Sequence, residues 1–126
     1  MTPFNAPDLR VSITSAARRS GLTQRAIRFY EDLGLVTAYR DRSGNRTFDR
    51  KGLGRLDYIA FARRAGLSLS QIDELLRTAQ TEGVAAEGAL LRELCEAKLA
   101  NLDRLREEVQ AVIASLPDRQ GSDIAR

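Results

Sequence analysis

The sequence predicts a mainly α-helical protein, in which a small head with one short β-hairpin is followed by a long C-terminal helix. Three observations support this fold class. Apolar residues recur at helical spacing, short helical segments end at glycines, and one heptad-spaced stripe runs through the last third of the chain. The length of 126 residues is that of one domain with an extension.

Composition excludes several classes of protein. The chain has no histidine and only one cysteine, so it cannot form a histidine-dependent catalytic triad, an imidazole metal site or an intrachain disulfide. No apolar run is long enough to span a bilayer, and the first ten residues lack the apolar core of a signal peptide. We therefore expect a cytoplasmic protein that is not an enzyme and binds no metal or cofactor.

Charge is distributed unevenly along the chain. Residues 1–66 carry 13 basic and 6 acidic side chains, a net charge of +7, whereas residues 67–126 carry 7 and 11, a net charge of −4. Of the 20 basic residues 18 are arginine, whose planar guanidinium matches phosphate oxygens and the guanine edge. A GC-rich genome would explain the choice of arginine but not its placement. The asymmetry indicates a nucleic-acid-binding head and a separate interaction segment.

The first two predicted helices are short and closely joined. After a mobile tail over residues 1–10, we expect Thr14 to cap a helix that ends at Gly21, and Thr23 to cap a second helix over Gln24–Leu33. A turn with a glycine between two short helices is typical of a helix-turn-helix. Three apolar residues of the second helix are expected in the core: Ile27, Phe29 and Leu33.

A β-hairpin is predicted next. The β-prone segments Leu35–Tyr39 and Thr47–Phe48 flank the tight-turn sequence Ser43–Asn45. The tip of this hairpin is rich in arginine, with side chains projecting from Arg40, Arg42 and Arg46.

Helical spacing then returns over Asp49–Ala65, and a further helix starts at Ser68 or Ser70. Small residues over 78–88 predict a connection. The head domain is therefore expected to span residues 11–80.

Residues 81–116 are predicted to form this connection and a long helix that dimerises. From Ala89 onward the stripe positions alternate at spacings of four and three, and only Lys98 among them is polar. Such a stripe calls for a partner helix, most economically from a second copy; the alternative is a helix that folds back on its own domain. Residues 117–126 are expected to be disordered. The predicted dimerisation residues are Leu91, Cys95, Leu102, Leu105, Val109, Val112 and Leu116.

Cys95 has two interpretations. Its position on the stripe favours a small buried apolar residue. The alternative is a thiol sensor near the dimer axis, for which Lys98 is the nearby cation that the sequence offers.

Four segments of the head carry a specific signature: Ile13–Ala17, Gly21–Leu35, Ser43–Phe48 and Arg63–Ile72. In this order they resemble the MerR family of bacterial transcription regulators, strongly over Val11–Leu76, while the long helix agrees by position only. The resemblance implies a winged helix-turn-helix, with the hairpin as its wing, and a dimer built on an antiparallel coiled coil.

The resemblance also implies a function. It predicts a homodimeric, sequence-specific regulator that binds double-stranded DNA at a pseudo-palindromic promoter operator, and that bends and untwists the promoter spacer so that RNA polymerase engages both promoter elements. The alternative is an architectural, nucleoid-associated protein with the same head and no inducer response. The sequence does not indicate a small-molecule effector.

Candidate DNA-binding residues lie on the exposed face of the second helix, on the wing and on the third helix. Arg25 and Arg28 are expected to contact bases or phosphates, and the wing and third-helix arginines match backbone contacts of the family. Tyr30 matches a tyrosine that donates its hydroxyl to a phosphate, although a packing role is as consistent with its position. The full set is Thr23, Gln24, Arg25, Arg28, Tyr30, Arg40, Arg46 and Arg63.

The chain departs from the family pattern in two places. Asn45 stands where the wing usually has an aromatic residue. After Leu116 there is no cysteine, whereas metal-sensing relatives have paired cysteines there and the redox-sensing branch has four that hold an iron–sulfur cluster. Because thiolates are the ligands that both groups require, neither is expected here.

Overall fold

The structure, a computed structural model, describes residues 9–118. Residues 1–8 and 119–126, which contain most of the two expected tails, lie outside the described residues. The chain divides into two compact units, one that ends at Glu87 and one that begins at Gly88. The first unit is the head, and the second is most of the long helix.

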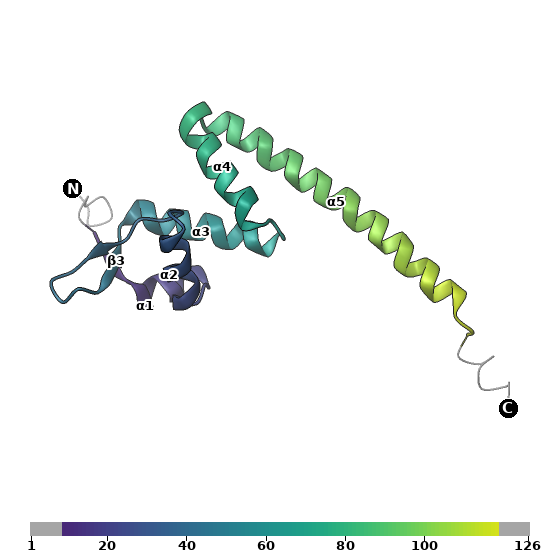
Figure 1. The fold of residues 1–126 in the computed structure, drawn as a ribbon, viewed down its shortest axis with the longest axis horizontal. Helices are drawn as coiled ribbons and strands as arrows, with labels where there is room; N and C mark the ends of the chain where they lie inside the picture. The colour runs from purple at the N-terminus through teal and green to yellow at the C-terminus, as the bar shows by residue number, and fades with distance from the viewer. Residues whose placement is uncertain (1–8, 119–126) are drawn as a thin grey trace. The chain divides into compact units, whose positions relative to one another are not determined.

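The predicted mainly α-helical fold is confirmed. Two short helices are followed by two longer ones and by a helix of 32 residues (Figure 1). The bounds are α1 Ile13–Ser20, α2 Gln24–Asp32, α3 Arg50–Arg64, α4 Leu69–Glu82 and α5 Val84–Ser115.

A three-stranded antiparallel sheet holds the wing to the head. Its strands are β1 (Val11–Ser12), β2 (Tyr39–Arg40) and β3 (Arg46–Phe48), in the order β1-β3-β2. β2 and β3 form the predicted hairpin, with Tyr39 opposite Thr47 and Arg40 opposite Arg46. The first strand of the hairpin is shorter than predicted, because the chain over Leu35–Val36 packs into the core instead.

Side-chain caps set the starts of the helices. Thr23 caps α2 as predicted, and its hydroxyl accepts a hydrogen bond from the Ala26 N–H at 3.0 Å. The prediction for α1 was wrong by two residues: Ser12, not Thr14, is the cap, and it accepts from the Ser15 N–H at 3.1 Å. Ser12 ends β1 in an extended conformation, so it already stands where a cap must be.

The connection predicted over residues 78–88 is not present. Helix α4 continues to Glu82 and α5 begins at Val84, so Gly83 alone separates them. Its φ of 101° lies in the region that glycine adopts readily, and its N–H donates to the carbonyls of Thr78 and Ala79. At the start of α4, Ser68 and Gln71 form a reciprocal capping box, which decides between the two predicted starts.

The core of the head lies between α1, α2, α3, α4 and the sheet. Ile27 is fully buried as predicted, but Phe29 and Leu33 are 49% and 50% exposed. At 100° per residue, positions two and six after Ile27 lie on the opposite side of α2, so they cannot share its core face. The largest fully buried side chains are Phe48, Ile27, Leu56, Ile59, Leu67, Ile72 and Leu75.

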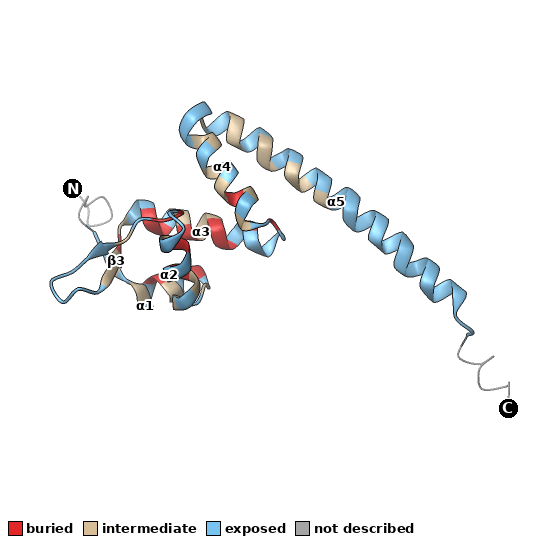
Figure 2. Ribbon diagram, viewed as in Figure 1, coloured by how far each residue is buried: buried red, intermediate tan, exposed pale blue. Residues whose placement is uncertain are grey.

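The long helix differs from the head in its burial. No residue of α5 is buried, and every described residue after Leu99 is exposed (Figure 2). None of the helices in the described part of the chain combines the length and apolar character that crossing a membrane requires.

Candidate nucleic-acid interface

A polar cleft of about 400 Å³ lies where α1 and α2 begin, beside the hairpin. It brings together four of the eight predicted DNA-binding residues, two from α2 and two from the wing. The side chains come from segments far apart in the sequence, and β1 joins them because it leads directly into α1 and pairs with β3. The lining residues are Ser12, Ile13, Thr14, Gln24, Arg28, Arg40, Asp41, Gly44, Asn45 and Arg46.

The α2 side of the cleft is ordered by two hydrogen bonds. The Gln24 Nε2 donates to the Thr14 hydroxyl at 3.2 Å, and an Arg28 Nη2 donates to the Gln24 Oε1 at 3.3 Å. The Gln24 side chain therefore links α1 to Arg28. Arg28 stays exposed, so its remaining N–H groups face solvent or a ligand.

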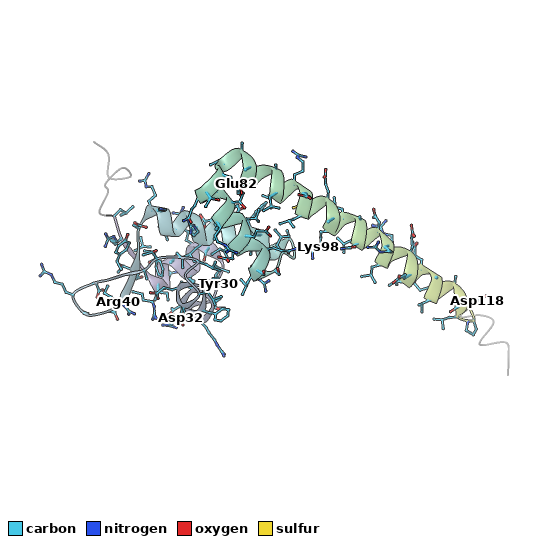
Figure 3. All side chains as sticks on the ribbon, turned by 45° about the horizontal axis from the view of Figure 1, so that its top comes forward. Tyr30, Asp32, Arg40, Glu82, Lys98 and Asp118 are labelled. Carbon is cyan, nitrogen blue, oxygen red and sulfur yellow. The ribbon has the colours of Figure 1, made fainter. Side chains whose placement is uncertain are left out.

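The wing side of the cleft is shaped by Asp41. Its Oδ1 accepts hydrogen bonds from the N–H groups of Ser43 and Asn45, each at 2.9 Å. Arg40 is exposed and its Nη1 donates to the Gly44 carbonyl at 3.0 Å. Figure 3 labels Arg40 on the hairpin, with Tyr30 and Asp32 on α2. The hydrogen bonds to Asp41 form an Asx-type turn that fixes the loop. Asn45 lies in this loop, at the position where the wing of the family usually has an aromatic residue.

The second wing arginine, Arg46, is held differently. Its Nε donates to the Glu31 Oε1 in a salt bridge, and the two side chains are 22% and 23% exposed. This ion pair connects β3 to α2. Sequence reasoning missed it, because residues 15 positions apart on different elements give no periodic signal.

The other four predicted residues do not line the cleft. Thr23 caps α2, and Arg25 is exposed on that helix. Tyr30 is 7% exposed and its ring lies 6.2 Å from that of Phe29, which agrees with the packing alternative. Arg63 is exposed near the end of α3, and its Nη1 donates to the Leu67 carbonyl at 2.9 Å.

The predicted dimerisation stripe lies on α5, except for Leu116, which directly follows the last residue of that helix. Leu91 and Cys95 are half-buried, whereas the stripe residues from Leu102 to Leu116 are between 49% and 59% exposed. Over residues 9–118 no three His, Cys, Asp or Glu side chains are grouped so that they could hold a metal ion.

Two family models match the chain. The model for the MerR HTH family regulatory protein matches residues 11–79, and the model described as MerR, DNA binding matches residues 53–118. Together they cover the head, the wing and the described part of the long helix.

Individual relatives agree. The chain is 30% identical to the HTH-type transcriptional regulator CueR of Salmonella typhimurium, over 90% of this chain and 86% of that protein. It is 30% identical to the HTH-type transcriptional regulator HmrR of Rhizobium leguminosarum bv. viciae, over 79% and 75%.

Solved structures show the same architecture. A MerR family transcriptional regulator from Listeria monocytogenes superposes with a TM-score of 0.64 at 27% identity, covering 81% of this chain and 80% of that one. HiNmlR, a MerR family regulator lacking the sensor domain and bound to promoter DNA, gives a TM-score of 0.59 at 25% identity, covering 84% and 80%. This chain therefore belongs to the MerR family of DNA-binding transcription regulators.

Proposed function

We propose that this protein regulates transcription as a homodimer that binds a pseudo-palindromic promoter operator through the cleft between α2 and the wing. One observation carries the proposal: the fold collects Gln24, Arg28, Arg40 and Arg46 around one cleft, although they come from two separate parts of the sequence. A cluster of this kind matches two features of duplex DNA at once, a base edge and the adjacent phosphate backbone.

The two sides of the cleft suit different parts of the duplex. The start of α2 presents Gln24, Arg25 and Arg28, as the recognition helix of a helix-turn-helix presents its first turns to the major groove. The hairpin presents Arg40, an exposed cation beside that helix, to the phosphate backbone. Base contacts from α2 would supply sequence choice, while the wing would supply affinity for any sequence.

The exposed stripe along the long helix supports dimerisation. Five stripe residues from Leu102 to Leu116 are about half exposed in the single chain. A second copy of the helix is the simplest partner that covers them. The resulting dimer has two-fold symmetry and therefore requires two half-sites in the operator. A dimer of fixed head spacing can regulate by deforming the DNA between the half-sites, as the family mechanism implies, so that RNA polymerase engages both promoter elements.

HiNmlR supports direct promoter binding by a chain of this size. That protein is a regulator that lacks the sensor domain and is bound to promoter DNA, and it matches 84% of this chain. We infer that this chain also binds promoter DNA directly, through its head.

A competition experiment separates this function from the architectural alternative. Genomic fragments bound by the purified protein are footprinted, and binding to the protected site is then competed with random DNA at fixed salt. A specific regulator binds its site roughly 10³–10⁷ times more tightly than random DNA. An architectural protein shows no such ratio and no discrete footprint. The spacer length between promoter elements at the footprint tests the deformation mechanism.

A further inference from the structure

We propose that Glu31 is a positioning residue for DNA binding: it holds the wing against α2 and orients Arg46 toward the phosphate backbone. This inference rests on the proposed function. It is unexpected from charge alone, because Glu31 places a carboxylate on the helix that carries the recognition residues. A carboxylate beside the DNA repels phosphates, so its presence on this helix calls for a structural gain that offsets the repulsion.

The geometry of the ion pair supports such a task. Arg46 Nε and Glu31 Oε1 form a salt bridge between β3 and α2, and both side chains are about three-quarters buried. A partly buried, charge-assisted pair is stronger and more direction-dependent than the exposed pairs of the head, such as Arg19 with Asp57 at 3.4 Å. It links the hairpin to α2 by a contact outside the sheet.

The register of the hairpin gives a second reason. Arg40 and Arg46 are directly opposite each other across β2 and β3. Like charges in this position are destabilising. By pairing with Arg46, Glu31 offsets this repulsion, and the hairpin can carry two arginines at the cleft. The carboxylate therefore makes the density of positive charge on the wing possible.

The ion pair with Glu31 leaves Arg46 able to contact DNA. Glu31 accepts from Nε, which bears one of the five N–H groups of the guanidinium. The two Nη nitrogens bear the other four, in the fork geometry that matches a phosphate. Glu31 thus orients the plane of the fork without occupying its outer edge, which agrees with the predicted backbone contact of Arg46.

The two effects of Glu31 have opposite signs, so one substitution distinguishes them. If the carboxylate acts only as a charge, Glu31→Gln removes repulsion and tightens DNA binding. If it positions the wing, the same change weakens binding. Asp32 is the matched control, because it is the next residue on α2, carries the same charge and is exposed. Asp32→Asn reports the charge effect alone.

Binding of the full-length variants to an operator fragment is measured by fluorescence anisotropy over a series of salt concentrations. We expect Glu31→Gln to bind about tenfold more weakly than Asp32→Asn. Its slope of log K against log salt should fall in magnitude by about 0.9, the value for one lost phosphate contact. A packing defect without loss of that contact leaves the slope unchanged. Binding by Glu31→Gln as tight as by Asp32→Asn overturns the proposal.

Two further variants guard against a folding defect. Glu31→Asp keeps the charge but shortens the side chain, so we expect it to lose affinity as Glu31→Gln does, while a pure charge effect leaves it unchanged. In the double variant Glu31→Gln/Arg46→Gln, the added loss from Glu31→Gln should vanish if the two residues act together; additive losses contradict the proposal. Absence of operator binding by the wild-type protein refutes the proposed function, whereas wild-type binding with unaffected Glu31 variants refutes this inference alone.

Discussion

The head and the long helix use their apolar residues in opposite ways. In the head, Ile59, Ile72 and Leu75 are fully buried by neighbouring elements of the same chain. In α5 no residue is buried, and Leu105 and Val112 are 54% and 58% exposed. The core side chains of the head are therefore covered by the same chain. The stripe on α5 is not covered within the described residues, so we expect the stability of this helix to depend on a partner.

The largest expected effect comes from placing a charge on the stripe. Leu105→Glu removes apolar burial from both copies of the dimer, at about 1.5–3 kcal/mol each, so we expect the dimer to weaken by about 10²–10⁴-fold. Sedimentation equilibrium measures this change, and operator binding should fall with it. Ala100→Glu introduces the same charge on the far side of the heptad and should leave the dimer intact. Equal association of both variants would mean that the stripe is not the interface.

Truncating one apolar side chain in each region sharpens the contrast. Ile59→Ala opens a cavity in the core of the head and should cost about 2–5 kcal/mol of unfolding free energy. Val112→Ala should cost less, and its effect on Tm should depend on protein concentration, because unfolding of the helix is coupled to dissociation. Thermal unfolding at several concentrations provides the test. A concentration-independent loss for Val112→Ala would contradict coupling to dimerisation.

Arginine substitutions test whether DNA binding is confined to the head. Arg28→Ala should weaken operator binding by about 1–3 kcal/mol and lower discrimination against random DNA, whereas Arg40→Ala should reduce affinity for every sequence alike. Arg106 is an exposed arginine on α5, and Arg106→Ala should change neither. Titrations with operator and random duplexes measure both quantities. Equal losses on the two duplexes for Arg28→Ala would refute base reading.

The smallest effect concerns the start of α1. Ser12→Ala removes the hydroxyl that accepts the Ser15 N–H and should lower the stability of the head by about 1 kcal/mol. Thr14→Ala, at the position that sequence analysis favoured for the cap, should cost less. Denaturant unfolding of the two variants compares them, and the reverse order of stability would assign the cap to Thr14.

The sequence predicted the elements of this fold well, because each depends on local signals. Helical spacing, the cap at Thr23 and the turn at Gly44 all act within a few residues. Two of the errors arose where the conformation of a residue depends on partners distant in the sequence. Leu35 and Val36 look like a strand but pack into the core, and Ser12 caps α1 because it ends a strand that pairs with β3.

The candidate site was predicted unevenly for the same reason. Arginine content and the signature of α2 indicated Arg28 and Arg40, which do line the cleft. Glu31 and Asp41, which order the wing, were not found, because acidic residues in a basic head give no signal for DNA binding. Their roles become apparent only from the residues that they contact in the folded structure.

The single residue between α4 and α5 has a mechanical consequence. With Gly83 as the whole junction, the direction in which the chain leaves α4 depends on the two backbone torsions of one residue. Helix α5 is about 48 Å long at 1.5 Å per residue. A change of about 10° at Gly83 would thus displace the far end of α5 by about 8 Å relative to α4. The torsions of this one glycine are therefore enough to redirect the whole helix.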